Sequence, residues 1–548
     1  MNSRSPVEPG RFSHFFKAVR VSAVLVIGLL IAPVAAVPSS VSGDLLISGS
    51  IGDAMILNPI LLGDSASSDI VSKVFNGLLK YDPGLKLVGD LAESYETSAD
   101  GLSITFELRR GVRWHDGAPF SARDVKFTFD TIMHPETRTP YRSSFEKVRY
   151  VEILGFHRVR VVYSEPFAPA LSSWTIGILP EHLLSGKDVN TAGFNRSPVG
   201  TGPFAFKEWR TNEKIVLVAN PDYFEGAPLL RGYVARVIPD QPVQFLELQA
   251  GNIDLCGLTD DLYETRAAEP RFLKRFHRFR YPSFGYAYVG YNLGRALFKD
   301  RRVRLALTYA IDRRALISGL LRGHGTEITG PFLPEASYYN ASVEALPYDP
   351  QKALDLLAEA GWSRTLNGDL VNAGGKIFKF TIITNQGNSL RAQCATGIQW
   401  MLKKIGMKVD VRIVAWPTFI AEFVNKRKFD AVLLGWSLDV EPDQYDIWHS
   451  SKTGEHEYNF VGYANDSVDR LLVEGRRTFS PKRRDEIYRR VHELIARDAP
   501  YTFLYRPQSL VALDCRFEGV KPTAIGLLYN IHEWYVPEGK GRYVISRD

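Results

Sequence analysis

The sequence predicts an α/β protein, and two observations in its C-terminal half carry this prediction. Residues 378–382 and 409–413 alternate in polarity as strands do, and between them Ser389 caps a helix that Gly406 ends. A strand, a helix and a strand in this order form parallel strands joined by a right-handed crossover. Residues 429–436 then form a nearly continuous apolar run, which is typical of a strand buried on both faces.

A region nearer the N-terminus mixes strands with a helix. Residues 91–130 indicate strands, a turn at Asp116-Gly117, and a helix that begins near Asp124 with Ser121 as its cap. This region is therefore expected to be of the α+β type.

Two helices are predicted between these regions. Asp300 caps a helix whose apolar residues recur at helical spacing and which should stop by Gly323. Asp349-Pro350 is a capping residue followed by proline at the first helical position, and Gly361 ends that shorter helix.

The composition is that of an ordinary globular protein. The chain has 548 residues, of which 45% are hydrophobic and 23% charged, with a formal net charge of +6. No long basic run occurs, so we expect no binding to nucleic acid. Three cysteines allow at most one disulfide and form no zinc motif.

The N-terminus predicts export from the cytoplasm. Four basic residues within the first 20 precede an uncharged stretch over residues 21–43, which includes the small residues Val34-Ala35-Ala36. We expect residues 1–36 to be a cleaved signal peptide and the protein to be periplasmic. An uncleaved membrane anchor is the alternative, because the uncharged stretch exceeds the roughly 18 residues needed to span a membrane.

Motifs of common enzyme classes are missing from the sequence. It contains neither a G-x-S-x-G nucleophile motif nor a phosphate-binding loop. His492-Glu493 begins a zinc-helix motif, but Ala496 stands where the second histidine is needed. His492 and Glu493 are therefore expected to be a pair of residues on the surface of a helix. The acidic residues 439–446 lack the glycine of a calcium loop. We expect no enzyme, metal or cofactor, although a pair of glycosidase carboxylates stays open.

Two charged residues follow neighbouring strands of the predicted sheet. Asp439 comes after the buried strand, where ligands of α/β sheets gather. Arg391 lies in the first turn of a helix, where the helix dipole disfavours a cation and an anion would relieve the mismatch. Each residue alone can be a solvated surface group. Together they predict a cleft that binds a small zwitterion.

Several sequence motifs resemble those of the family 5 extracellular solute-binding proteins, which are the dipeptide- and oligopeptide-binding components of bacterial ABC importers. The similarity runs from about residue 44 to residue 507. The matching segments are Leu91-Ala92-Glu93-Ser94-Tyr95, Arg110-Gly111-Val112-Arg113-Trp114-His115-Asp116-Gly117, Gly200-Thr201-Gly202-Pro203-Phe204, Asn220-Pro221-Asp222-Tyr223-Phe224, Ala310-Ile311-Asp312-Arg313 and Glu359-Ala360-Gly361-Trp362.

The resemblance implies a two-lobed periplasmic-binding-protein fold of the α/β class. The chain would cross twice between the lobes, and an additional domain would sit on the first lobe. The implied boundaries are 37–78, 197–283 and 504–548 for the first lobe, 79–196 for the additional domain and 284–503 for the second lobe.

The resemblance also implies a binding site. In peptide-binding relatives, an Asp three positions after a Trp holds the α-ammonium group of the peptide, and Trp436 and Asp439 keep this spacing. Gly435 and Ser437 would offer backbone hydrogen bonds to an extended ligand. Arg391 falls where dipeptide binders place an Arg for the ligand carboxylate.

Three further positions complete the comparison with the family. Trp416 and Tyr505 match aromatic residues of the cleft, and Leu433 stands where some oligopeptide binders carry an additional cleft Arg. The last difference leaves open whether longer peptides bind.

The function that the resemblance implies is capture of a small peptide and delivery to the permease subunits of an ABC transporter, by a monomer without a cofactor. The alternatives are a binder of a nickel chelate, an opine or a sugar, and a sensor that presents its ligand to a receptor, because fold does not fix the ligand. An exported hydrolase has the least support.

Overall fold

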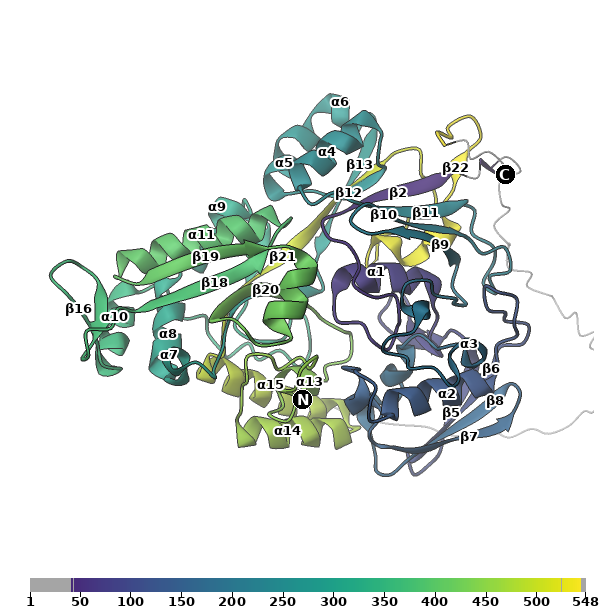
Figure 1. The fold of residues 1–548 in the computed structure, drawn as a ribbon, viewed down its shortest axis with the longest axis horizontal. Coiled ribbons are helices and arrows are strands. Elements are labelled where there is room, and N and C mark those ends of the chain that lie inside the picture. Colours follow the sequence, from purple (N-terminus) through teal and green to yellow (C-terminus); the bar gives the residue numbers. More distant parts are fainter. Residues whose placement is uncertain (1–40, 43, 524, 544–548) are drawn as a thin grey trace, which may run out of the picture. The chain divides into compact units, whose positions relative to one another are not determined.

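Twelve of the described strands form one mixed sheet (Figure 1). The computed structural model describes residues 41–42, 44–523 and 525–543, so the predicted signal peptide over residues 1–36 lies outside the described residues. In spatial order the sheet consists of β19 (Lys408–Val414), β18 (Lys379–Asn385), β20 (Ala431–Ser437), β14 (Gly285–Tyr291), β21 (Tyr501–Asp514), β12 (Leu255–Gly257), β2 (Leu45–Ser50), β11 (Gly232–Val237), β10 (Lys214–Ala219) and β9 (Phe204–Arg210), and both β13 (Phe276–Pro282) and β15 (Gly325–Glu327) also pair with β21.

The long strand β21 joins the two halves of this sheet. Residues at its beginning pair with β14 and β15, and residues at its end pair with β12 and β13. We call the half with β14, β15 and β18–β20 the second lobe, and the half with β2 and β9–β13 the first lobe. The chain crosses between them from β13 to β14 and again within β21, so the two crossings expected of the fold are present.

The second lobe buries both faces of its sheet. Along β14, Val289 and Tyr291 belong to one hydrophobic core and Tyr286 and Tyr288 to another, because successive side chains of a strand point to opposite faces. The helices of this lobe are α7 (Ala296–Lys299), α8 (Arg301–Ala310), α9 (Arg313–Leu320), α10 (Pro350–Glu359), α11 (Ser389–Lys404), α12 (Trp416–Thr418), α13 (Tyr445–Trp448), α14 (Asp466–Arg477) and α15 (Pro481–Asp498). A π-helical turn follows α12 over Phe419–Val424, and β16 (Trp362–Arg364) pairs with β17 (Leu370–Asn372).

The first lobe packs four helices against its sheet, and a separate sheet lies beside it. The helices are α1 (Ser65–Val74), α4 (Gln241–Ala250), α5 (Asp260–Glu264) and α6 (Pro270–Leu273). Small ladders join β1 (Val41–Ser42) to β22 (Val536–Pro537) and β3 (Leu79–Tyr81) to β4 (Leu87–Gly89). The separate antiparallel sheet has the order β5 (Ala92–Thr97), β6 (Ser103–Leu108), β8 (Arg158–Tyr163) and β7 (Val148–Gly155), with α2 (Ala122–Met133) and α3 (Glu181–Leu184).

This separate sheet has its own hydrophobic core. Trp114 and Trp174 are buried in it together with the apolar face of α2. We call the part of the chain from β5 to α3, residues 92–184, the small subdomain.

Most of the predicted elements are confirmed. The β-α-β unit exists as β18, α11 and β19, with the two strands parallel. Ser121, Asp300 and Asp349 each cap the helix predicted for them. The apolar run over residues 429–436 forms β20, buried on both faces from Ala431 to Leu434.

Three local predictions are wrong. The cap of α11 is Asn388, one residue before Ser389, because the Asn388 side chain accepts from the backbone N–H of Arg391. The helix predicted to run toward Gly323 breaks after Ala310, where Asp312 caps a second helix, α9.

His492 was expected on a helix surface, but its side chain is fully buried. It lies on the inner face of α15, while its neighbour Glu493 pairs with Arg490. A helix that is covered along one face buries whatever residue type occupies that face. Cys256, Cys394 and Cys515 are all free thiols within the described chain.

Candidate functional site

The C-terminal end of β20 carries the first group of predicted site residues. Ser437 is exposed where the strand ends, and Trp436 is half-buried one residue before it. The Trp436 ring stacks against Tyr288 and Phe460, with centroids 6.4 and 5.8 Å away, and its Nε1 donates to the hydroxyl of Tyr501 at 3.3 Å. These contacts fix the orientation of the Trp436 ring.

The acidic segment after β20 uses most of its carboxylates internally. Glu441 forms an ion pair with Arg484, and Asp443 accepts from Arg476 at 2.8 Å. Asp446 lies 3.9 Å from both Arg476 and Lys452. These three carboxylates are therefore compensated by neighbouring cations.

Asp439 differs from the other carboxylates of this segment. Its Oδ1 accepts from the backbone N–H of Val440 at 2.6 Å, and no cation of the described residues lies within salt-bridge distance. The side chain is accessible to solvent, yet the surrounding protein desolvates it and raises its pKa. Asp439 is thus a negative charge without a partner.

Phenol groups from two distant parts of the chain lie near Asp439. Desolvation, and then the negative charges of Glu441 and Asp439, raise the pKa of Tyr338 to about 12. Desolvation and the charge of Asp439 also raise the pKa of Tyr81, which belongs to β3. The charge of Asp439 therefore disfavours ionisation of Tyr338 and of Tyr81, two phenols from distant parts of the chain.

Arg391 is the complementary charge. It lies in the first turn of α11, where its Nη1 donates to Oδ1 of Asn385 at 2.8 Å. A Cβ atom placed on Gly435 would lie 3.0 Å from its Nη2, so the guanidinium rests against β20. Among the described residues no carboxylate pairs with it, and desolvation lowers its pKa. A half-buried guanidinium without a carboxylate partner favours an anionic ligand.

Trp416 and its neighbourhood touch the opposite lobe. The Nε1 of Trp416 donates to Asp64, the cap of α1, at 3.3 Å, and the Trp416 side chain lies 3.5 Å from where a Cβ on Gly52 would be. Tyr458 donates from its hydroxyl to the carbonyl of Leu62 at 3.3 Å. The predicted site therefore borders a surface where the two lobes are in contact.

Two positions that were expected at the cleft, Tyr505 and Leu433, are buried. Tyr505 is only 1% exposed and pairs with Ala287, so it supports the sheet beneath Arg391 instead of opening onto solvent. Burial raises its pKa, and the positive charge of Arg391 opposes this rise. Leu433 was expected at the cleft, but its side chain is fully buried in the core on the face of β20 opposite to Trp436. Its identity therefore gives no information on ligand length.

Sequence reasoning missed the phenols of Tyr81, Tyr338 and Tyr458. They come from regions far apart in the chain, and single tyrosines in loops carry no motif. The hydrophobic pattern of these regions gave no sign that they converge.

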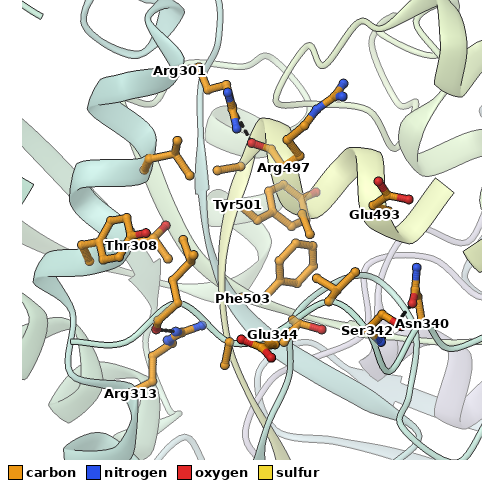
Figure 2. Close-up of a pocket in the computed structure, with 18 residues that line it drawn as sticks. Arg301, Thr308, Arg313, Asn340, Ser342, Glu344, Glu493, Arg497, Tyr501 and Phe503 are labelled. Carbon is orange, nitrogen blue, oxygen red and sulfur yellow. Dashed lines mark hydrogen bonds between the residues drawn. The ribbon is translucent and has the colours of Figure 1, made fainter. Parts of the chain in front are cut away.

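A separate cavity of about 640 Å³ lies in the second lobe and contains none of the predicted site residues (Figure 2). Tyr501 and Phe503 line it together with Thr308 of α8. At its rim Arg301 donates to the carbonyl of Arg497 at 2.6 Å. Its connection to the predicted site is Tyr501, whose hydroxyl accepts from Trp436.

Within the described chain, no group of three or more His, Cys, Asp or Glu side chains is arranged to hold a metal ion. Over the same residues, every helix is too short or too polar for a membrane span.

Comparisons with known proteins give a consistent result. The sequence model of the bacterial extracellular solute-binding proteins, family 5, matches residues 86–457. The oligopeptide-binding protein AppA of Bacillus subtilis is 36% identical over 508 residues, which cover 90% of this chain and 92% of that protein. Its structure in complex with a nonapeptide has a TM-score of 0.86 at 35% identity and covers 91% of this chain and all of that one.

Two further solved structures are similar. The ABC transporter-associated periplasmic binding protein DppA of Helicobacter pylori, in complex with the peptide STSA, has a TM-score of 0.82 at 26% identity and covers 91% of this chain and 99% of that one. NikZ of Campylobacter jejuni, in complex with Ni(L-His), also has a TM-score of 0.82, at 28% identity, with 90% and 100% covered. Similar folds thus hold different ligands.

Proposed function

Because the chain belongs to family 5 of the bacterial extracellular solute-binding proteins, we propose that it captures a peptide between its two lobes and delivers it to an ABC importer. The similarity to AppA and to DppA, both solved with peptides, supports this function. These relatives are binding proteins, and a catalytic role is not part of the proposal.

One observation carries the proposal: two unpaired charges of opposite sign flank the end of β20. Asp439 would bind the α-ammonium group of a peptide, and Arg391 would bind a carboxylate. Each charge lies in surroundings that desolvate it, where an ion pair is stronger than in water. A zwitterionic ligand would neutralise both at once.

The backbone of β20 supports an extended ligand. On the side toward β18, the ladder covers only Ala431 and Val432, so none of the described strands pairs with that edge near Gly435 and Ser437. A peptide lying there could form main-chain hydrogen bonds as an added strand does. Trp436 and Trp416 would contact its side chains, and Tyr505 would support Arg391 from below.

The remaining assignments follow the family. We assign residues 37–78, 197–283 and 504–548 to the first lobe, 79–196 to an additional domain and 284–503 to the second lobe. Export with cleavage after Ala36 would place the mature protein in the periplasm, where it would act as a monomer.

The test uses calorimetry with the peptides that mass spectrometry identifies in the purified protein. Loss of one partner of a buried ion pair costs about 3–5 kcal/mol, so Asp439→Asn should weaken binding by roughly a hundredfold or more. N-acetylated peptides should bind the unchanged protein equally poorly. Glu344→Gln removes a carboxylate from the rim of the separate cavity and should leave affinity unchanged.

Two results would overturn the proposal. Normal binding of acetylated peptides would show that Asp439 does not hold an ammonium group. Recovery of a nickel chelate in place of a peptide would assign the protein to the other ligand class found among its relatives.

A further inference from the structure

Arg476 is a buried charge where the second lobe meets the small subdomain. It lies in the last turn of α14, and its side chain is 4% exposed. Its Nε donates to Asp443 at 2.8 Å, while Nη2 and Nη1 donate to the hydroxyl and carbonyl oxygens of Ser143 at 3.1 and 3.2 Å. Asp443 belongs to the acidic segment that begins with Asp439, and Ser143 belongs to the small subdomain. The Arg476 guanidinium thus binds both the acidic segment and the small subdomain.

Ser143 completes the network from the opposite side. Its hydroxyl donates to Oδ1 of Asp446 at 2.5 Å while it accepts from Arg476. A serine hydroxyl has one hydrogen to donate and lone pairs to accept with, so both contacts can exist together. Ser143 therefore contacts the acidic segment and the guanidinium simultaneously.

Aromatic rings enclose the guanidinium from both partners. Its Cζ lies 3.8 Å from the ring centre of Tyr445 in the acidic segment and 5.6 Å from that of Phe167 in the small subdomain. Cation–π contacts of this kind strengthen when water is excluded. Separation of the two partners would remove Phe167 and Ser143 and would leave Arg476 with the acidic segment alone.

The acidic segment is short enough to couple these contacts to the ligand. Asp443 follows Asp439 by four residues, and Asp446 follows it by seven. We therefore expect a displacement of Asp443 and Asp446 to shift the backbone that carries Asp439.

We propose that Arg476 is a positioning residue that holds the segment 439–446 against the small subdomain and thereby slows ligand release. The effect on release rests on the proposed function, since it requires a ligand bound at Asp439. The coupling between Ser143 and the acidic segment does not require a ligand.

The first experiment is hydrogen exchange on the ligand-free protein. Ser143→Ala removes both hydroxyl contacts, and hydrogen bonds to charged groups typically contribute enough to change an opening equilibrium about tenfold or more. We expect exchange to rise about tenfold in the amides of residues 438–446 as well as in residues 141–146. A rise confined to residues 141–146 would overturn the proposal.

The chain offers a matched control at the next residue. Arg477 also reaches the small subdomain, where it pairs with Glu165 at 2.6 Å, but its side chain is 54% exposed. Exposed pairs contribute little, so Arg477→Met should leave exchange in residues 438–446 within about twofold of the unchanged protein. Arg476→Met should raise exchange in residues 438–446 as Ser143→Ala does. Arg476→Lys keeps the positive charge and should raise exchange there by a smaller factor.

The second experiment measures release of the tripeptide Ala-Lys-Ala, with a fluorescent label on the side-chain amine of its lysine so that both termini stay free. We expect Ser143→Ala to raise the dissociation rate about tenfold or more while the association rate stays within about twofold. An unchanged dissociation rate in a variant that binds this peptide would overturn the effect on release. If the unchanged protein does not bind the peptide, the proposed function loses support, and the exchange experiment alone decides on the coupling.

Discussion

Acid should destabilise this protein through His492 in a way that one substitution can isolate. The ring is fully buried between α15 and the segment over residues 328–346. Its Nε2 lies 3.0 Å from Oγ1 of Thr329, and its Nδ1 accepts from the backbone N–H of Asn340 at 3.2 Å. Protonation of Nδ1 would place a second hydrogen against that N–H, so the folded state favours the neutral ring.

The magnitude follows from the shift in pKa. Desolvation lowers the pKa of His492 to about 4 in the folded protein, against about 6.5 in an unfolded chain. The unfolded state therefore binds the proton more strongly, and stability falls as the pH drops from about 6.5 to about 4. The full difference corresponds to about 3 kcal/mol.

Two buried carboxyl groups act in the opposite direction over the same range. Desolvation raises the pKa of Asp90 and of Asp254 to about 6, so their protonation stabilises the folded state as the pH falls. The pH profile of the unchanged protein alone therefore does not isolate His492. Comparison with His492→Gln does, because both proteins contain the same carboxyl groups.

The assay is urea denaturation of both proteins between pH 7 and pH 4. Gln can donate to Thr329 and accept from Asn340, so His492→Gln should be modestly less stable at pH 7 and should gain about 3 kcal/mol relative to the unchanged protein by pH 4. A difference between the two proteins that stays constant with pH would refute the reasoning. So would a histidine resonance assigned to His492 that titrates near pH 6.5.

Two further substitutions have expected outcomes. Gly435→Ala would place a Cβ 3.0 Å from both the Nη2 of Arg391 and a backbone carbonyl, so we expect ligand affinity to fall about tenfold in calorimetry and the melting temperature to fall as well; a fall in melting temperature with unchanged affinity would contradict the role in ligand binding. Arg516→Met would leave the buried carboxylates of Asp44 and Asp254 without their guanidinium, and denaturation should show a loss of about 3–5 kcal/mol. A loss below about 1 kcal/mol would mean that Arg542, 3.7 Å from Asp254, compensates them.

The sequence sufficed for features that depend on neighbouring residues. The β-α-β unit, the cap of α2 and the buried strand β20 all follow from local patterns of polarity, because hydrogen bonding within a helix and alternation along a strand act over a few residues. One of the three local errors has a local cause as well. Asn388 and Ser389 can both cap a helix, and only the backbone geometry chooses between them.

The candidate site, too, could be predicted from the sequence only in part. Asp439 and Arg391 could be singled out from the sequence because each follows a predicted strand of one sheet, and the family resemblance adds Trp436 and Trp416. That Asp439 is unpaired while its acidic neighbours are compensated could not be foreseen. It depends on Arg476 and Arg484, which come from helices elsewhere in the chain.

The sequence by itself determined the elements, the family and the residue types available for a zwitterionic ligand. Only the tertiary structure decided which charges stay free, that Leu433 points into the core and that His492 is buried. It also brought Ser143 to Arg476, which lies 333 residues further along the chain. The physical reason is that burial and charge compensation depend on contacts between segments far apart in the chain, and such contacts leave no period or spacing in the sequence.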